Sequence, residues 1–189
     1  LRKAIWPNYP NDHVINVDVV ASPVENIANL AKISVPNETK FILVEENGSG
    51  TDYPFSGEKM CLVLAVYKYK NFDDAVKRLV DNQSYSGAGH SCGIFSKSQD
   101  NIINLALNSY TVRVVVNQPQ SHANTGTWTN GMPFCSGLGC GTWGGNVASE
   151  NITLKHYMNT TWVTSVIQDE PPTDQELFGD LRKQQWVKA

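Results

Sequence analysis

Five short apolar runs, typical of β-strands, alternate along the chain with segments whose apolar residues recur at helical spacing. They cover residues 14–21, 41–44, 60–66, 91–95 and 111–116. Strands separated by helices of roughly ten residues form βαβ units, and such units place their strands parallel to one another. The sequence therefore predicts an α/β fold, with a mostly parallel sheet and flanking helices.

Cap residues predict where the helices begin. Asn71, Ser98 and Thr173 each precede a helical pattern, and their side chains suit an N-cap. Ser22 followed by Pro23 predicts a further helix start, because proline is favoured at the first helical position. In parallel sheets, ligands bind beyond the carboxyl ends of the strands, so the loops beside the strands are candidate sites.

One loop, residues 132–146, contains five glycines, two cysteines and a tryptophan. Glycine costs conformational entropy in regular structure, but it allows positive φ and a close approach of the backbone to a ligand. The wider segment 117–146 is too long for a simple connection, and loops of that length are usually functional or mobile. We expect a ligand-binding role for this glycine loop.

Composition excludes several classes of function. The net charge is −3 with no basic stripe, which argues against a nucleic-acid surface. No apolar run approaches the ~20 residues of a membrane span. Four irregularly spaced cysteines predict neither a zinc site nor a disulfide scaffold, so we expect a cytoplasmic protein. The start at Leu1, without a signal-like apolar region, predicts a trimmed or excised chain.

Four motifs resemble a known family. Residues 56–67 followed by 71–76 resemble the aldehyde dehydrogenase superfamily. The run Gly87-Ala88-Gly89-His90-Ser91 and residues 138–146 are similar to its CoA-acylating branch. That branch includes enzymes acting on sulfoacetaldehyde, succinate semialdehyde or acetaldehyde, and the aldehyde half of aldehyde–alcohol dehydrogenase. The resemblance extends from about residue 12 to Val163 and implies the fold of that family's catalytic domain.

The resemblance implies a definite chemistry. In the family, a cysteine thiolate attacks the aldehyde, hydride passes to NAD or NADP, and coenzyme A takes the acyl group from the resulting thioester. The nucleophilic cysteine and the nucleotide-binding domain lie upstream of the segment that this chain resembles. Cys140 matches a separate cysteine of the family's glycine loop. The chain therefore resembles a C-terminal part of such an enzyme, and we predict that it is inactive alone.

The resemblance also implies site residues. Glu58 matches a glutamate that hydrogen-bonds the nicotinamide-side ribose hydroxyls, although by itself it reads as a solvated loop carboxylate. His90 matches a histidine of the acylating branch and suits proton transfer to or from the CoA thiol; the alternative is a histidine that only hydrogen-bonds its loop. Leu138 and Gly139 are expected to line the nicotinamide and acyl pocket, and a tight structural turn is compatible with that role.

The chain is expected to comprise a partial catalytic domain, residues 1–150, and an extended arm and tail, residues 151–189. Residues 151–167 resemble an arm that pairs with another subunit in this superfamily, which implies a homo-oligomer, since an exposed strand needs a partner edge. Two alternatives to an acylating enzyme on a small aldehyde remain open. One is a CoA-independent enzyme that releases a free acid, and the other is a non-catalytic assembly domain.

Overall fold

The computed structural model describes residues 1–183 of the chain. The chain divides into two compact units, Leu1–Tyr157 and Met158–Ala189. The first unit contains all the described strands and the candidate site. None of the described helices is long and apolar enough to cross a membrane.

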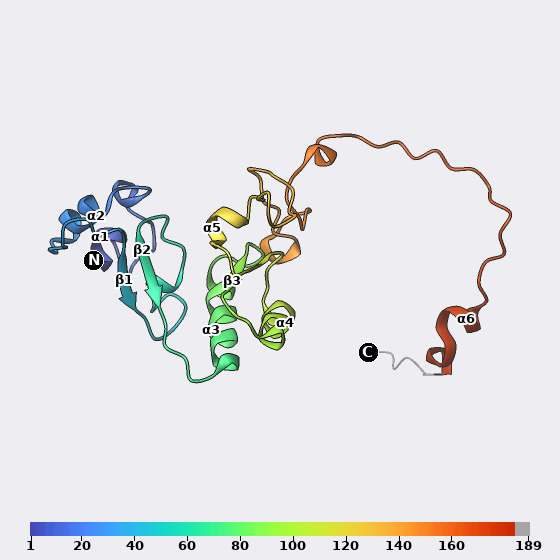
Figure 1. The fold of residues 1–189 in the computed structure, drawn as a ribbon, viewed down its shortest axis with the longest axis horizontal. Coiled ribbons are helices and arrows are strands. Elements are labelled where there is room, and N and C mark those ends of the chain that lie inside the picture. The colour runs from blue at the N-terminus through green and yellow to red at the C-terminus, as the bar shows by residue number, and fades with distance from the viewer. Residues whose placement is uncertain (184–189) are drawn as a thin grey trace. The chain divides into compact units, whose positions relative to one another are not determined.

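Four strands form two parallel pairs, of which β1 and β2 are seen side by side in Figure 1. β1 (Ile42–Glu45) pairs with β2 (Val63–Val66), and β3 (Cys92–Ile94) pairs with β4 (Val114–Val116). Helices interleave with these strands along the chain, so the predicted α/β class with parallel strands is confirmed. Within residues 1–183 the strands form two small sheets and not one continuous sheet.

The two longest helices begin where the sequence predicts. α3 (Phe72–Tyr85) is capped by Asn71, whose side chain accepts a hydrogen bond from the backbone N–H of Asp74 at 2.9 Å. α4 (Gln99–Asn108) is capped by Ser98 in the same way. Each cap satisfies a backbone donor that the first helical turn leaves free.

The prediction for the first long helix is wrong by one residue. α2 (Val24–Ala31) has Pro23 at its N-cap, and among residues 1–183 no side chain caps it and no hydrogen-bond partner reaches the buried hydroxyl of Ser22. The predicted strand at residues 14–21 is also wrong, because Val17–Val19 forms a 3-10 turn. Asn16 explains this difference: its side chain accepts from Asp18 N and donates to the carbonyl of Ala4, which holds the chain away from any sheet.

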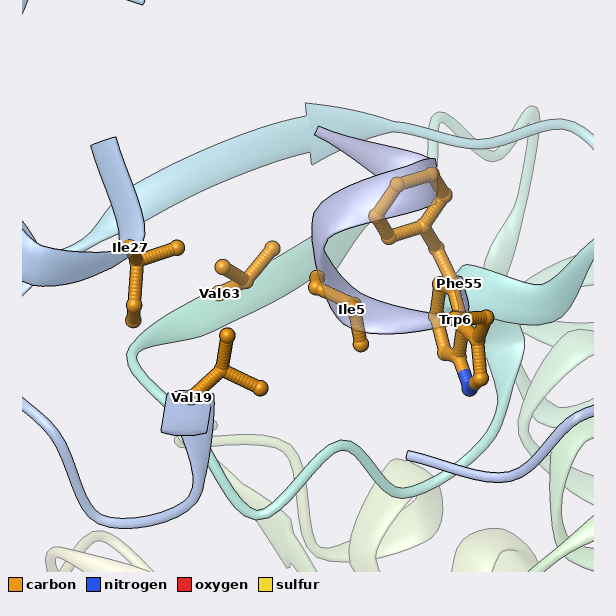
Figure 2. Close-up of a cluster of buried hydrophobic side chains, with 6 residues drawn as sticks. All are labelled: Ile5, Trp6, Val19, Ile27, Phe55 and Val63. Atoms are coloured by element: carbon orange, nitrogen blue, oxygen red, sulfur yellow. The ribbon is translucent and has the colours of Figure 1, made fainter. Parts of the chain in front are cut away.

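Two hydrophobic clusters support the first unit. The first joins Val63 of β2 to several N-terminal segments. Its members, drawn in Figure 2, are Ile5, Trp6, Val19, Ile27, Phe55 and Val63. The Trp6 and Phe55 rings meet edge to face with centroids 5.2 Å apart. The second cluster lies where α3 and α4 pack on the other strand pair, and it consists of Val76, Cys92, Ile94 and Leu105.

Short helical turns complete the described structure. The remaining α-helices are α1 (Arg2–Ile5), α5 (Gln120–Ala123) and α6 (Asp174–Phe178). The other 3-10 turns are Pro54–Ser56, Thr142–Gly144, Leu154–His156 and Gly179–Lys183. α6 begins at Thr173 with a capping box, as the sequence predicts.

The C-terminal segment is extended but carries no described strand. Residues 159–173 contain neither helix nor strand, and the only described strand-like pairing of the predicted arm is an antiparallel bridge between Asn151 and Leu138. An oligomerisation arm at residues 151–167, and the division into residues 1–150 and 151–189, therefore stay predictions.

Candidate functional site

A cavity of about 540 Å³ opens between the loop before β2, helix α3 and the loop before β3. Glu58 lines it from the first loop, and His90 lines it from the second. Gln120 of α5 lines it as well. The structure thus brings together two of the four predicted site residues, which come from motifs far apart in the sequence.

A backbone hydrogen bond fixes the loop that carries Glu58. The backbone N–H of Glu58 donates to Ser86 Oγ at 3.2 Å, which ties this loop to the end of α3. The neighbouring Lys59 Nζ donates to the carbonyls of Phe55 at 2.7 Å and Gly57 at 2.8 Å. Burial lowers the pKa of the Lys59 ammonium. The Glu58 side chain itself is exposed, so its carboxylate is free to accept hydrogen bonds from a ligand.

His90 is held at Nδ1 by the next residue. Its Nδ1 lies 2.7 Å from Ser91 Oγ, and that hydroxyl oxygen also accepts from Gln120 Nε2 at 2.9 Å and Asn124 Nδ2 at 3.0 Å. Within the described residues, no hydrogen bond engages His90 Nε2, so this nitrogen is available to a ligand. The family motif points to His90, whereas no sequence pattern points to Ser91, Gln120 or Asn124 as partners in these hydrogen bonds.

A buried arginine secures the main chain behind the cavity. Arg113 is 5% exposed, and it donates to the carbonyls of His90 at 2.8 Å and Gly139 at 2.7 Å, and to Asn151 Oδ1 at 2.7 Å. Asn151 is also buried, and its Nδ2 donates to the carbonyls of Asn124 and Pro133. These bonds connect the histidine loop to the glycine loop.

Leu138 and Gly139 do not line the cavity. Their segment pairs with residues 148–152, with Gly139 N donating to the carbonyl of Glu150 at 3.0 Å. Gly139 is buried, and a Cβ there would collide with the carbonyl of Ala148. The glycine at this position is therefore needed for a close backbone approach within the chain, and a cofactor-binding role for Leu138 and Gly139 stays a prediction.

The cysteine at the cavity is a poor nucleophile. Cys92 lines the cavity, but it is 4% exposed and its burial raises the pKa of the thiol, which disfavours the nucleophilic thiolate. The thiols of Cys135 and Cys140 donate to nearby carbonyls of the glycine loop and lie outside the cavity lining. All four cysteines are free.

The chain is similar in sequence and in fold to known aldehyde dehydrogenases. The sequence is 42% identical to a sulfoacetaldehyde dehydrogenase of Acholeplasma sp, across 100% of this chain and 39% of that protein. It is 38% identical to an acylating sulfoacetaldehyde dehydrogenase of Bilophila wadsworthia, across 97% of this chain and 40% of that protein. The fold matches the crystal structure of an acetylating aldehyde dehydrogenase from Geobacillus thermoglucosidasius with a TM-score of 0.80 at 27% identity, covering 91% of this chain and 38% of that one. No family model matches the chain.

These matches share one class, the aldehyde dehydrogenases. Both sequence relatives and the solved structure match most of this chain, which confirms its resemblance to the acylating aldehyde dehydrogenases. It spans about two fifths of the length of the two relatives it matches.

Proposed function

We propose that this chain is part of an enzyme that converts a small aldehyde into an acyl-CoA, with NAD or NADP and coenzyme A, and that the nucleophilic cysteine lies outside this chain. One observation carries the proposal: Glu58 and His90, which stand in two separate family motifs, line the same cavity. Relatives named for sulfoacetaldehyde favour a small aldehyde with an acidic group as the substrate. Free cysteines favour a cytoplasmic enzyme.

The exposed carboxylate of Glu58 fits a ribose. A carboxylate only accepts hydrogen bonds, and a ribose diol offers two hydroxyl donors side by side. The backbone bond to Ser86 fixes the loop, so Glu58 is held at the cavity without using its own carboxylate. When bound, NAD or NADP would accept a hydride from the substrate. The cavity of about 540 Å³ suits one end of a dinucleotide, in agreement with a nucleotide domain elsewhere in the enzyme.

His90 is proposed to act in the CoA-dependent half of the reaction. His90 lines the same cavity as Glu58, with Nδ1 bonded to Ser91 and Nε2 available within the described residues. The hydrogen bond from Arg113 to the His90 carbonyl limits movement of the loop. A ring so placed is positioned to meet a thiol or an acyl group that enters the cavity.

The proposal is tested on the full-length enzyme that carries this sequence. NAD(P)H formation is followed with sulfoacetaldehyde, succinate semialdehyde and acetaldehyde, with and without coenzyme A, and the acylated product is identified by mass spectrometry. We expect steady turnover and an acyl-CoA only when coenzyme A is present. A free acid formed at the same rate without coenzyme A would instead establish the hydrolysing alternative.

The isolated 189-residue chain serves as the matched control. We expect no turnover from it, because the thiolate nucleophile would be missing. Steady NAD(P)H production by the isolated chain would contradict the assignment of the nucleophile to another part of the protein. Light scattering on the full-length enzyme and on a version lacking residues 151–167 addresses the proposed homo-oligomer, which a clean monomer would exclude.

A further inference from the structure

We propose that Ser91 is a positioning residue that fixes the tautomer of His90, so that the neutral ring carries its proton on Nε2 and acts as a hydrogen-bond donor. The inference rests on the proposed function for its consequence in acyl transfer. The tautomer itself follows from three hydrogen bonds at one oxygen atom, Ser91 Oγ.

A hydroxyl group can donate one hydrogen bond and accept two, because it has one proton and two lone pairs. The amide nitrogens of Gln120 and Asn124 lie 2.9 Å and 3.0 Å from Ser91 Oγ. An amide NH₂ group only donates, so these two bonds use both lone pairs of the hydroxyl oxygen. The hydroxyl proton is then left for the third neighbour, His90 Nδ1, at 2.7 Å.

The acceptor role of Nδ1 determines the state of the ring. A neutral imidazole has one donor nitrogen and one acceptor nitrogen. If Nδ1 accepts from Ser91, the proton of the neutral ring is on Nε2, the nitrogen that is available to the cavity. With that proton in place, Nε2 has no lone pair to take a proton from a thiol. His90 is instead suited to donate to an acceptor such as the carbonyl oxygen of an acyl group, where negative charge develops during transfer.

The two amides differ in burial and in the bonding of their own oxygen atoms, so the orientation of the Asn124 amide has to be considered separately. Gln120 is half-buried on α5 at the cavity, whereas Asn124 is 5% exposed and its Oδ1 is buried without a partner among the described residues. An inverted Asn124 amide would present its oxygen to Ser91, take the hydroxyl proton and reverse the order of donors. The ring would then carry its proton on Nδ1, and the direct measurement below separates the two arrangements.

The test uses nitrogen-15 NMR of the histidine rings in the labelled 189-residue chain, which requires no substrate. His90→Gln identifies the His90 signals among those of the four histidines. In the neutral ring we expect an imine-type, hydrogen-bonded Nδ1 and a pyrrole-type Nε2. A pyrrole-type Nδ1 in the unmodified chain would overturn the inference.

One variant alters the donors to Ser91, and a second variant is its matched control. Gln120→Glu replaces a donor to Ser91 by a carboxylate acceptor, so we expect the Ser91 hydroxyl to turn toward the carboxylate. The proton of the neutral His90 ring should then move from Nε2 to Nδ1. Gln118→Glu adds the same charge two positions away, where the native amide bonds the Val116 carbonyl and not Ser91, and we expect no exchange. An unchanged ring in Gln120→Glu would contradict the inference.

Ser91→Ala provides a second measurement that does not depend on a new charge. We expect its His90 Nδ1 signal to move to the position of a non-bonded imine nitrogen, while Ser91→Thr, which keeps the hydroxyl, retains the native position. In the full-length enzyme, Ser91→Ala should lower kcat of the CoA-dependent reaction about tenfold, with recovery in Ser91→Thr. Identical ring signals in Ser91→Ala and the unmodified chain would overturn the inference, whereas absence of any CoA-dependent turnover would refute only the proposed function.

Discussion

The Arg113 guanidinium donates through Nε to the Asn151 side-chain oxygen at 2.7 Å, and both residues are buried. The remaining bonds of Arg113 reach the carbonyls of His90 and Gly139. One side chain immediately before β4 therefore connects the histidine loop, the glycine loop and the segment that follows it. These hydrogen bonds fix the main chain of both loops, and they leave the side chain of His90 at the cavity, where a ligand can reach it.

Asn151→Ala is expected to destabilise the first unit markedly. It leaves one guanidinium N–H and the carbonyl of Asn124 without these partners in a buried region, and it removes a half-buried bond to the carbonyl of Pro133. Unmade buried bonds of this kind cost about 2–4 kcal/mol in total free energy of unfolding. Urea denaturation measures the loss. Asn108→Ala, which removes exposed bonds to Asn104, is the control and should change stability by less than ~0.5 kcal/mol.

Local signals in the sequence predict the helix starts because each depends on residues close in the chain. Asn71 and Asp74 are three positions apart, and their hydrogen bond forms in any helix that begins there. The parallel pairing of β3 with β4 follows from the helix α4 between them, whereas β1 and β2 are joined by a segment whose only helical turn is Pro54–Ser56. The alternation at residues 14–21 misleads, because Asn16 uses its side chain for local and tertiary bonds that the pattern does not reveal.

The support behind the site could not be predicted in the same way. Arg113 stands in a run of β-branched residues that predicts only a strand, and two of its three acceptors are main-chain carbonyls, which carry no residue-type signal. Glu58 and His90 were found through family motifs, but their presence at one cavity depends on tertiary packing. Ser91 could have been suspected from its place beside His90, whereas the amides of Gln120 and Asn124 reach it across the fold.

Gly89→Ala should be far more harmful than Gly87→Ala, although both glycines have positive φ in the same loop. A Cβ at Gly89 would collide with the carbonyl oxygen of Cys140 in the glycine loop, whereas a Cβ at Gly87 meets nothing within 4 Å. We expect about 1–2 kcal/mol for the backbone strain in either variant. Gly89→Ala should lose a further ~1–3 kcal/mol from overpacking. Equal denaturation midpoints would contradict the close approach of the two loops.

Cys92 should contribute a pH dependence to stability. Burial raises the pKa of its thiol above the ordinary 9.0, so above pH 9.0 the unfolded thiol ionises before the folded one. The unfolded state then binds fewer protons, and the free energy of unfolding falls as the pH rises through this window. Cys92→Ala removes this contribution, and its stability should fall less steeply above pH 9.0 in a urea denaturation series. Parallel curves for the two proteins would refute the assignment.

Glu58→Gln in the full-length enzyme should weaken the binding of NAD or NADP. The amide keeps one acceptor oxygen but loses the charge and the second acceptor, so it cannot receive both ribose hydroxyls equally well. We expect KM for the cofactor to rise about tenfold, which corresponds to the loss of one charge-assisted hydrogen bond. Steady-state kinetics with varied cofactor measure the effect. Glu25→Gln, at the exposed first turn of α2, is the control, and an unchanged KM in Glu58→Gln would argue for a solvated loop carboxylate.

His90→Ala in the full-length enzyme should separate the two halves of the reaction. We expect CoA-dependent turnover to fall about 10²-fold, because the ring would no longer donate to the acyl group during transfer. Hydride transfer in a single turnover without coenzyme A should be retained, since His90 is assigned no part in that step. Rapid-mixing measurements of NAD(P)H, with and without coenzyme A, resolve the two phases. His122→Ala, at an exposed position outside the cavity lining, is the matched control. Equal losses in both phases of His90→Ala would show that the histidine supports the site as a whole and not acyl transfer alone.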